Sequence, residues 1–499
     1  MAAQFYSKVL DQSTDKIYTD GGLLRFIAIL FISLTGVMAS AQVENLSELA
    51  LFNRCYANLT GNRMPFNNSL RASVANGSVT AINACMQVFD SARLQSSGPL
   101  VSDTPQGRLV LQKLNDFHRS WFPNDNLETS IPEGLSFNRA TRFLYDQGES
   151  ALHVSRTLFV PGVNYSDVVL GRDSMEALRT SGPISNAVNT NIGLVVPLAG
   201  APSYDSGYDR LNMQTELVQF GDLIGLRPIT LNPVKINLSV MSSQRGPDGF
   251  YQYRMPMKPH ESLGGGVLGT KSYLMLNLGR SDYFTMDGGA KVPRRWARAA
   301  YNSFLCRDVP LIRREDAVPY VQATGLPFRQ SSSCMQCHAS MDRTANVARN
   351  VSYRSIPGLT DDSNMQLAIW PVTQPPEAGP VSSDNQFHAR PTNGNLYYRS
   401  YDGTLVNQNL SSIQDFGNAL ATSNDLYVCT ASRYFKFFTG IEANLNDIGD
   451  VTKPALTADE LKYRNQVIAL GLELKTSQNL RQLIQKILSS DTYRRSSLE

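Results

Sequence analysis

The sequence predicts a mainly helical protein with irregular loops and a few short strands, and three observations lead to this fold class. The 499 residues are 42% apolar and 18% charged, which is a globular composition with ample apolar surface for a core. Apolar residues recur at helical spacing near both ends, as in the stripe formed by Leu480, Leu483, Ile484, Ile487 and Leu488. Residues 186–290 are instead rich in Gly, Pro and Asn and contain only short strand-like pieces.

The first 41 residues have the pattern of a secretory signal peptide. An apolar run, Phe26–Val37, follows Arg25 and precedes Ala39 and Ala41, the two small residues of an A-x-A cleavage site. The run is short for a membrane span, although a retained anchor or a buried core helix are the alternatives. Cleavage near Ala41 predicts a mature chain in the periplasm, in the cell envelope or secreted, with no transmembrane anchor.

One motif carries a specific chemistry. Cys334, Cys337 and His338 form a C-x-x-C-H sequence. Two thiols at this spacing can form thioethers with the two vinyl groups of one haem, and the histidine then serves as the proximal ligand of the iron. A chance match is improbable in a chain with six cysteines and five histidines. We therefore expect one covalent haem c, which agrees with export because this haem is attached outside the cytoplasm.

Two other interpretations of the same motif are a redox-active Cys334–Cys337 pair and a structural zinc site. Zinc would need further ligands, and the sequence has no second C-x-x-C and no paired histidines. For the second axial position of a haem iron, Met365 and His388 are the candidates, and Met341 is too close to His338 to reach the opposite face. An open iron position is the third alternative.

The other four cysteines suggest two disulfides, because unassigned cysteines of an exported protein usually pair. Cys55 and Cys85 lie on two consecutive helical segments, so we expect them to staple an antiparallel helix pair. A bond between Cys306 and Cys429 would clamp the haem segment between two helices, and free buried thiols are the alternative.

The charged and glycine-rich segments point to few other functions. Arg294, Arg295 and Arg298 could neutralise haem propionates, although a solvated helix face is the simpler interpretation. The net charge of +3 argues against nucleic acid as a partner. The run Gly264–Gly269 lacks the Lys-Ser/Thr of a P-loop, and no H-E-x-x-H or G-x-S-x-G motif indicates a zinc protease or a serine hydrolase.

Three segments resemble the large exported haem proteins first recognised in planctomycetes, a poorly characterised family. The segments are Gly266–Leu274 with Arg294–Cys306, then Cys334–Asp342 with its C-x-x-C-H-x-x-x-D pattern, and finally Cys429–Arg494. The resemblance covers about half of the chain and implies a central cytochrome c-like domain followed by a helical domain. The chain departs from the family pattern after Asp342 and lacks a separate N-terminal C-x-x-C-H, so it resembles a shortened member with a single haem.

The resulting organisation is a signal peptide (1–41), an N-terminal helical domain (42–185), a loop-rich region (186–290), a haem-attachment region (291–412) and a C-terminal helical domain (413–499). The predicted function is electron transfer in the cell envelope to an unidentified redox partner. A haem enzyme of the peroxidase or oxidase kind is one alternative, so catalysis is left open. A non-catalytic envelope protein with structural disulfides is the other.

Overall fold

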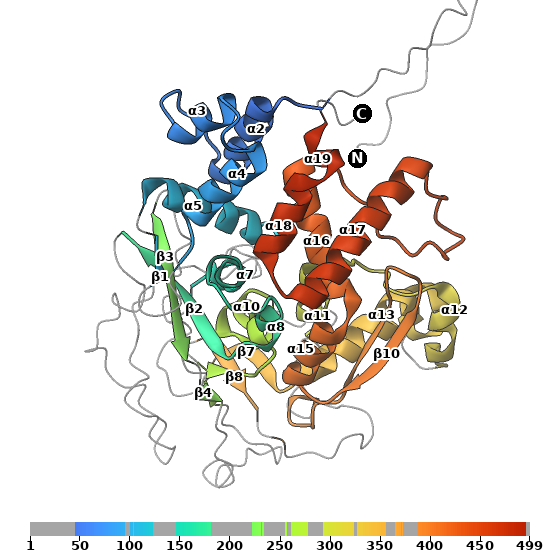
Figure 1. The fold of residues 1–499 in the computed structure, drawn as a ribbon. Helices are drawn as coiled ribbons and strands as arrows, with labels where there is room; N and C mark the ends of the chain where they lie inside the picture. The colour runs from blue at the N-terminus through green and yellow to red at the C-terminus, as the bar shows by residue number, and fades with distance from the viewer. Residues whose placement is uncertain are drawn as a thin grey trace, which may run out of the picture. The chain divides into compact units, whose positions relative to one another are not determined.

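The computed structural model describes residues 45–94, 100–102, 104–122, 146–180, 222–230, 232–233, 255–256, 261–277, 293–323, 327–355, 365–370, 372 and 387–495 (Figure 1). The predicted signal peptide lies outside these residues. Leu46–Glu499 forms one compact unit. The mainly helical fold class is confirmed, because helices dominate and the strands of the described part form small sheets of two or three strands. Among the described helices, none is both long enough and apolar enough to cross a membrane.

The N-terminal part of this unit is a cluster of four helices. Their bounds are Glu48–Thr60 (α2), Ser69–Ala75 (α3), Ala81–Asp90 (α4) and Pro105–Arg119 (α5). Each helix follows a residue whose side-chain oxygen accepts a backbone hydrogen bond, namely Ser47, Asn68, Thr80 and Thr104. Cys55 of α2 is bonded to Cys85 of α4, so the expected stapled helix pair forms.

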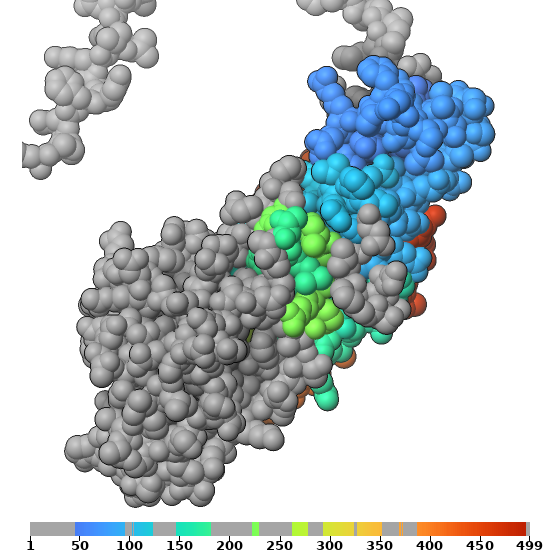
Figure 2. Space-filling view, turned by 90° about the vertical axis from the view of Figure 1, so that its left-hand side faces the viewer, coloured from blue at the N-terminus to red at the C-terminus, as the bar shows by residue number. Residues whose placement is uncertain are grey.

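A small antiparallel sheet follows. Its strands are Leu100–Val101 (β1), Asp173–Arg179 (β2) and Leu223–Thr230 (β3), with β3 between β1 and β2. Two helices, Glu149–Phe159 (α7) and Asp167–Leu170 (α8), precede β2 in the chain. The sequence predicts helices as far as residue 185, whereas β2 is a strand. Its buried charged side chains explain the difference, because Arg179 binds Asp146 at 2.9 Å and Glu176 lies 3.9 Å from Arg227 of β3. Such tertiary contacts outweigh a weak local preference. Figure 2 shows α5 beside these strands.

The glycine-rich turn at Gly264–Gly266 packs closely against the backbone of a neighbouring helix. The short elements here are Asn232–Pro233 (β4), Met255–Pro256 (β5), Glu261–Ser262 (β6), Gly266–Gly269 (η3) and Lys271–Asn277 (α10). Gly264, Gly265 and Gly266 all have positive φ, at 84°, 73° and 57°. A Cβ on Gly266 would lie 2.3 Å from the carbonyl oxygen of Val168. Glycine is therefore required for backbone packing at this turn.

The central region carries the C-x-x-C-H motif on a helix. Its helical elements are Arg294–Leu305 (α11), Arg314–Ala317 (α12), Val318–Tyr320 (η4), Pro327–Gln330 (η5), Ser332–Ala345 (α13) and Asn346–Ala348 (η6). Its strands are Val351–Ser355 (β7), Met365–Ile369 (β8), Gly394–Arg399 (β9) and Leu405–Leu410 (β10). The strands β9 and β10 form a hairpin, and Gly403 in its turn has a φ of 82°. Helices α11 and α13 lie side by side (Figure 1).

The C-terminal region is helical, as the sequence predicts. The helices are Ile413–Thr422 (α15), Asn424–Thr439 (α16), Ala458–Ser477 (α17), Leu480–Ser489 (α18) and Asp491–Arg494 (α19). Thr457 and Glu460 form a capping box at the start of α17. The apolar stripe of α18 is buried. Helix α16 packs against α11, α17 and α18 and also against the N-terminal helix α2, so it joins distant parts of the chain (Figure 1).

Candidate functional site

The candidate site is one face of α13. Cys334, Cys337 and His338 stand three and four positions apart, so they share one side of the helix over a single turn. All three side chains are partly exposed. An adjacent side of α13, with Met335 and Ala339, packs against Tyr397 in a small apolar cluster. Burial of that side fixes the rotation of α13 and keeps the two thiols and the imidazole turned away from the cluster.

A carboxylate orients the imidazole of His338. Nδ1 of His338 lies 3.2 Å from both Oδ1 and Oδ2 of Asp342, one turn further along α13. Because a carboxylate only accepts hydrogen bonds, Nδ1 donates and Nε2 is left as the basic nitrogen. The ring of Phe328 packs against the imidazole, with 4.5 Å between the centroids. This is the arrangement in which a ligating histidine is held by a second contact at its other nitrogen.

Asp342 is in turn held by an arginine from the neighbouring helix. Arg294, at the start of α11, donates Nε to Oδ1 at 2.5 Å and Nη2 to Oδ2 at 3.1 Å. Burial alone would raise the pKa of Asp342, but the hydrogen bonds from His338 and Arg294 outweigh it and leave the pKa lowered. Asp342 is therefore ionised at neutral pH. The sequence leaves open whether these arginines neutralise haem propionates or form a solvated face. In the structure Arg294 is paired with Asp342, while Arg298 is 56% exposed and binds Asp308 at 2.7 Å.

The two thiols of the motif are both free. Burial and the negative charge of Asp308 raise the pKa of Cys337, so this thiol stays protonated at neutral pH. In the described part of the chain, no three His, Cys, Asp or Glu side chains are grouped so that they could hold a metal ion. Two free thiols and an oriented imidazole fit the donor set of a covalently attached haem.

The other cysteines are bonded in the pairs that the sequence predicts. Cys55 is bonded to Cys85, and Cys306 is bonded to Cys429. The second bond joins the C-terminal end of α11 to α16. Because Arg294 at the other end of α11 holds Asp342, this disulfide anchors the helix that supports the candidate site.

The two candidates for a second axial ligand lie in other elements. Met365 begins β8, where it is paired with Ser355. His388 is buried and stacks on Trp370, with 5.0 Å between the centroids, and its Nδ1 bonds to the carbonyl oxygen of Arg349. The second iron ligand stays a prediction.

A cleft of about 1000 Å³ lies on another side of α13. It is lined by the segment after α11, by α16 and by the loop before α17, and Gln336 is the residue of α13 that reaches it. Gln336 is two positions from both Cys334 and His338 and therefore lies on the far side of the helix from them. The charged residues that line the cleft are largely paired within the protein. Arg313 binds Asp447 at 2.6 Å, and Lys436 binds Glu442 at 2.6 Å.

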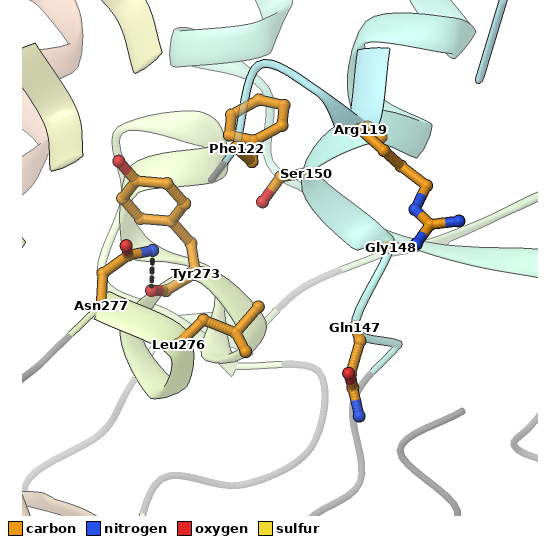
Figure 3. Close-up of a pocket in the computed structure, with 9 residues that line it drawn as sticks. Arg119, Phe122, Gln147, Gly148, Ser150, Tyr273, Leu276 and Asn277 are labelled. Carbon is orange, nitrogen blue, oxygen red and sulfur yellow. Dashed lines mark hydrogen bonds between the residues drawn. The ribbon is translucent and has the colours of Figure 1, made fainter. Parts of the chain in front are cut away.

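A second cavity is too small for a ligand. It has a volume of about 10 Å³ and lies between α7 and α10, with Phe122, Ser150 and Tyr273 among its walls (Figure 3). Asn277 beside it bonds through Nδ2 to the carbonyl oxygen of Tyr273 at 2.8 Å. A cavity of this size holds about one water molecule. It therefore carries no substrate site.

Comparison with known proteins gives no further assignment. No family model matches the chain, and no curated protein and no solved structure matches it either. The function must therefore be argued from the residues of α11 and α13 themselves.

Proposed function

We propose that the protein is a c-type cytochrome-like haem protein that transfers electrons through one haem attached to Cys334 and Cys337. The observation that supports this most directly is the distribution of cysteine states. Four of the six cysteines are in disulfides, and the two that remain free stand one helical turn apart beside His338. Free thiols that avoid pairing in a disulfide-containing chain suit a site where both are consumed by another bond.

Each residue of the site has a role in this proposal. Cys334 and Cys337 would hold the haem, each through a thioether formed by addition of its S–H across a vinyl group, so that no atom would be lost. Nε2 of His338 would bind the iron, and Asp342 holds the imidazole through Nδ1. When bound, the haem supplies a one-electron Fe(III)/Fe(II) couple. Met365 or His388 is proposed for the sixth position.

The proposal includes a location and a partner. Disulfides favour an oxidising compartment, so we place the protein in the periplasm, in the cell envelope or outside the cell. The resemblance of Cys334–Asp342 to the exported haem proteins of planctomycetes supports the same location. The partner is then another redox protein of the envelope, because a covalent haem on a surface helix exchanges electrons by encounter.

Attachment is tested by haem staining of denatured protein that was produced in a host with c-type haem maturation. Only covalently held haem survives denaturing electrophoresis. We expect a stained band for the wild type and none for C334A/C337A. The matched control is C55A/C85A, which removes two cysteines outside the site and should still stain. Staining that persists in C334A/C337A, or a colourless wild type, would contradict attachment and leave a non-catalytic envelope protein.

A haem enzyme is the second candidate, and the contact between His338 and Asp342 favours it. A carboxylate at Nδ1 makes the imidazole a stronger donor to iron, which suits the activation of a ligand on the opposite face. Carbon monoxide added to the reduced protein separates the two functions. An unchanged spectrum would indicate that protein side chains occupy both iron positions that the haem ring leaves, as in an electron carrier, whereas a shifted spectrum would indicate an open position and an enzyme.

A further inference from the structure

Arg294, Asp342 and His338 form a continuous chain of contacts between two helices. The guanidinium of Arg294 binds both carboxylate oxygens of Asp342, at 2.5 Å and 3.1 Å, and Nδ1 of His338 lies 3.2 Å from the same two oxygens. The side chain of Arg294 is 15% exposed, that of Asp342 20% and that of His338 23%, so solvent screens their charges only in part. Asp342 therefore shares its negative charge between a cation and the imidazole.

Asp342 and Arg294 have opposite effects on the donor strength of the His338 imidazole. A carboxylate that accepts from Nδ1 draws the proton towards itself and makes Nε2 a stronger electron donor. A guanidinium that binds both oxygens of that carboxylate withdraws charge from it and weakens this effect. The net donor strength of His338 then depends on Arg294, a residue that does not touch the imidazole.

We propose that Arg294 is a positioning residue that limits how strongly Asp342 acts on His338, and so holds the reduction potential of the attached haem above the value that the His338–Asp342 pair alone would set. The inference rests on the proposed haem attachment. A stronger donor stabilises Fe(III), so loss of Asp342 should raise the potential and loss of Arg294 should lower it. The opposite signs distinguish this role from general damage to the site.

The test is a redox titration of the haem-loaded full chain and its variants. We expect a higher midpoint potential for D342N than for the wild type and a lower one for R294Q. Removal of a positive charge near iron would also lower the potential without Asp342, so the double variant decides. If Arg294 acts through Asp342, R294Q causes no further shift in the D342N background. An equal shift in both backgrounds, or none in either, would overturn the inference.

Two further variants keep the test interpretable. R313Q is the matched control, because Arg313 also binds an aspartate through two bonds, at 2.6 Å and 2.9 Å to Asp447, and is 21% exposed. It should leave the potential unchanged. If R294Q does not fold, R294K keeps the charge but cannot bind both oxygens in the same way, and should give a smaller fall. A potential that shifts as far in R313Q as in R294Q would contradict a specific role.

A measurement without haem separates this inference from the proposed function. In the colourless C334A/C337A protein, nitrogen NMR of His338 reports which ring nitrogen carries the proton. We expect the Nδ1–H form, and a shift towards the Nε2–H form in an added D342A substitution. If the wild type holds haem but its potentials do not follow the predicted signs, only the inference fails. If no haem attaches, the proposed function fails and the inference about the potential fails with it, while the expected NMR result would still show that Asp342 orients His338.

Discussion

Nε2 of His118 lies 2.6 Å from the hydroxyl oxygen of Tyr434, although the two residues are 316 positions apart. The contact joins α5 to α16, and Nδ1 of the same ring lies 2.8 Å from Oγ of Ser155 in α7. His118 is fully buried, and its burial lowers its pKa to about 3. The imidazole is therefore neutral in the folded protein and links three helices through both nitrogens.

This burial predicts a loss of stability below neutral pH. The pKa of His118 is about 3 in the folded chain against an ordinary value of 6.5, so the unfolded chain takes up the proton first as the pH falls. The free energy of unfolding then decreases as the pH falls below about 6.5. Urea unfolding at pH 7.5 and pH 5 measures the effect. H118Q should lose much of this pH dependence; an equal dependence in H118Q would contradict the prediction.

The two disulfides should differ in their contribution to stability. The chain-entropy model predicts about 5 kcal/mol for Cys306–Cys429, which spans 123 positions, and about 3.5 kcal/mol for Cys55–Cys85, which spans 30. C306A/C429A should therefore unfold at a lower denaturant concentration than C55A/C85A. Equilibrium unfolding of both variants under oxidising conditions makes the comparison. A reversed order would show that packing of the buried Cys55 and Cys85 outweighs loop closure.

The glycine-rich turn predicts a steric effect that a matched glycine can isolate. Gly266 has a φ of 57°, and an added Cβ would lie 2.3 Å from the carbonyl oxygen of Val168. Gly77 has a φ of 76° but nothing within 4 Å of such a Cβ. Backbone strain alone should lower the free energy of unfolding of G77A by about 1 kcal/mol. In G266A the added steric overlap should increase this loss to about 3 kcal/mol. Similar unfolding midpoints for the two variants would refute the packing argument.

Much of the fold could be predicted because local signals and tertiary packing agree. The capping box of Thr457 and Glu460, the stripe of α18 and the hairpin around Gly403 all form. Strand β2 could not be predicted, because its buried Glu176 and Arg179 depend on partners elsewhere in the chain. A local pattern contains no information about such partners.

The candidate site was predictable only in part. The spacing of Cys334, Cys337 and His338 places them on one helical face without knowledge of the fold. The spacing of four between His338 and Asp342 also signals a contact on a helix, and this contact is present. The role of Arg294 could not be inferred in this way, because it depends on how α11 packs against α13.

The pyridine haemochrome spectrum tests the central claim most directly. The protein is produced in a host with c-type haem maturation and extracted with acidified acetone, which removes haem that is not covalently bound. We expect one haem per chain to stay with the protein and C334A/C337A to be colourless. A colourless wild type would contradict covalent haem attachment. Neither the electron-transfer proposal nor the haem-enzyme proposal would then hold.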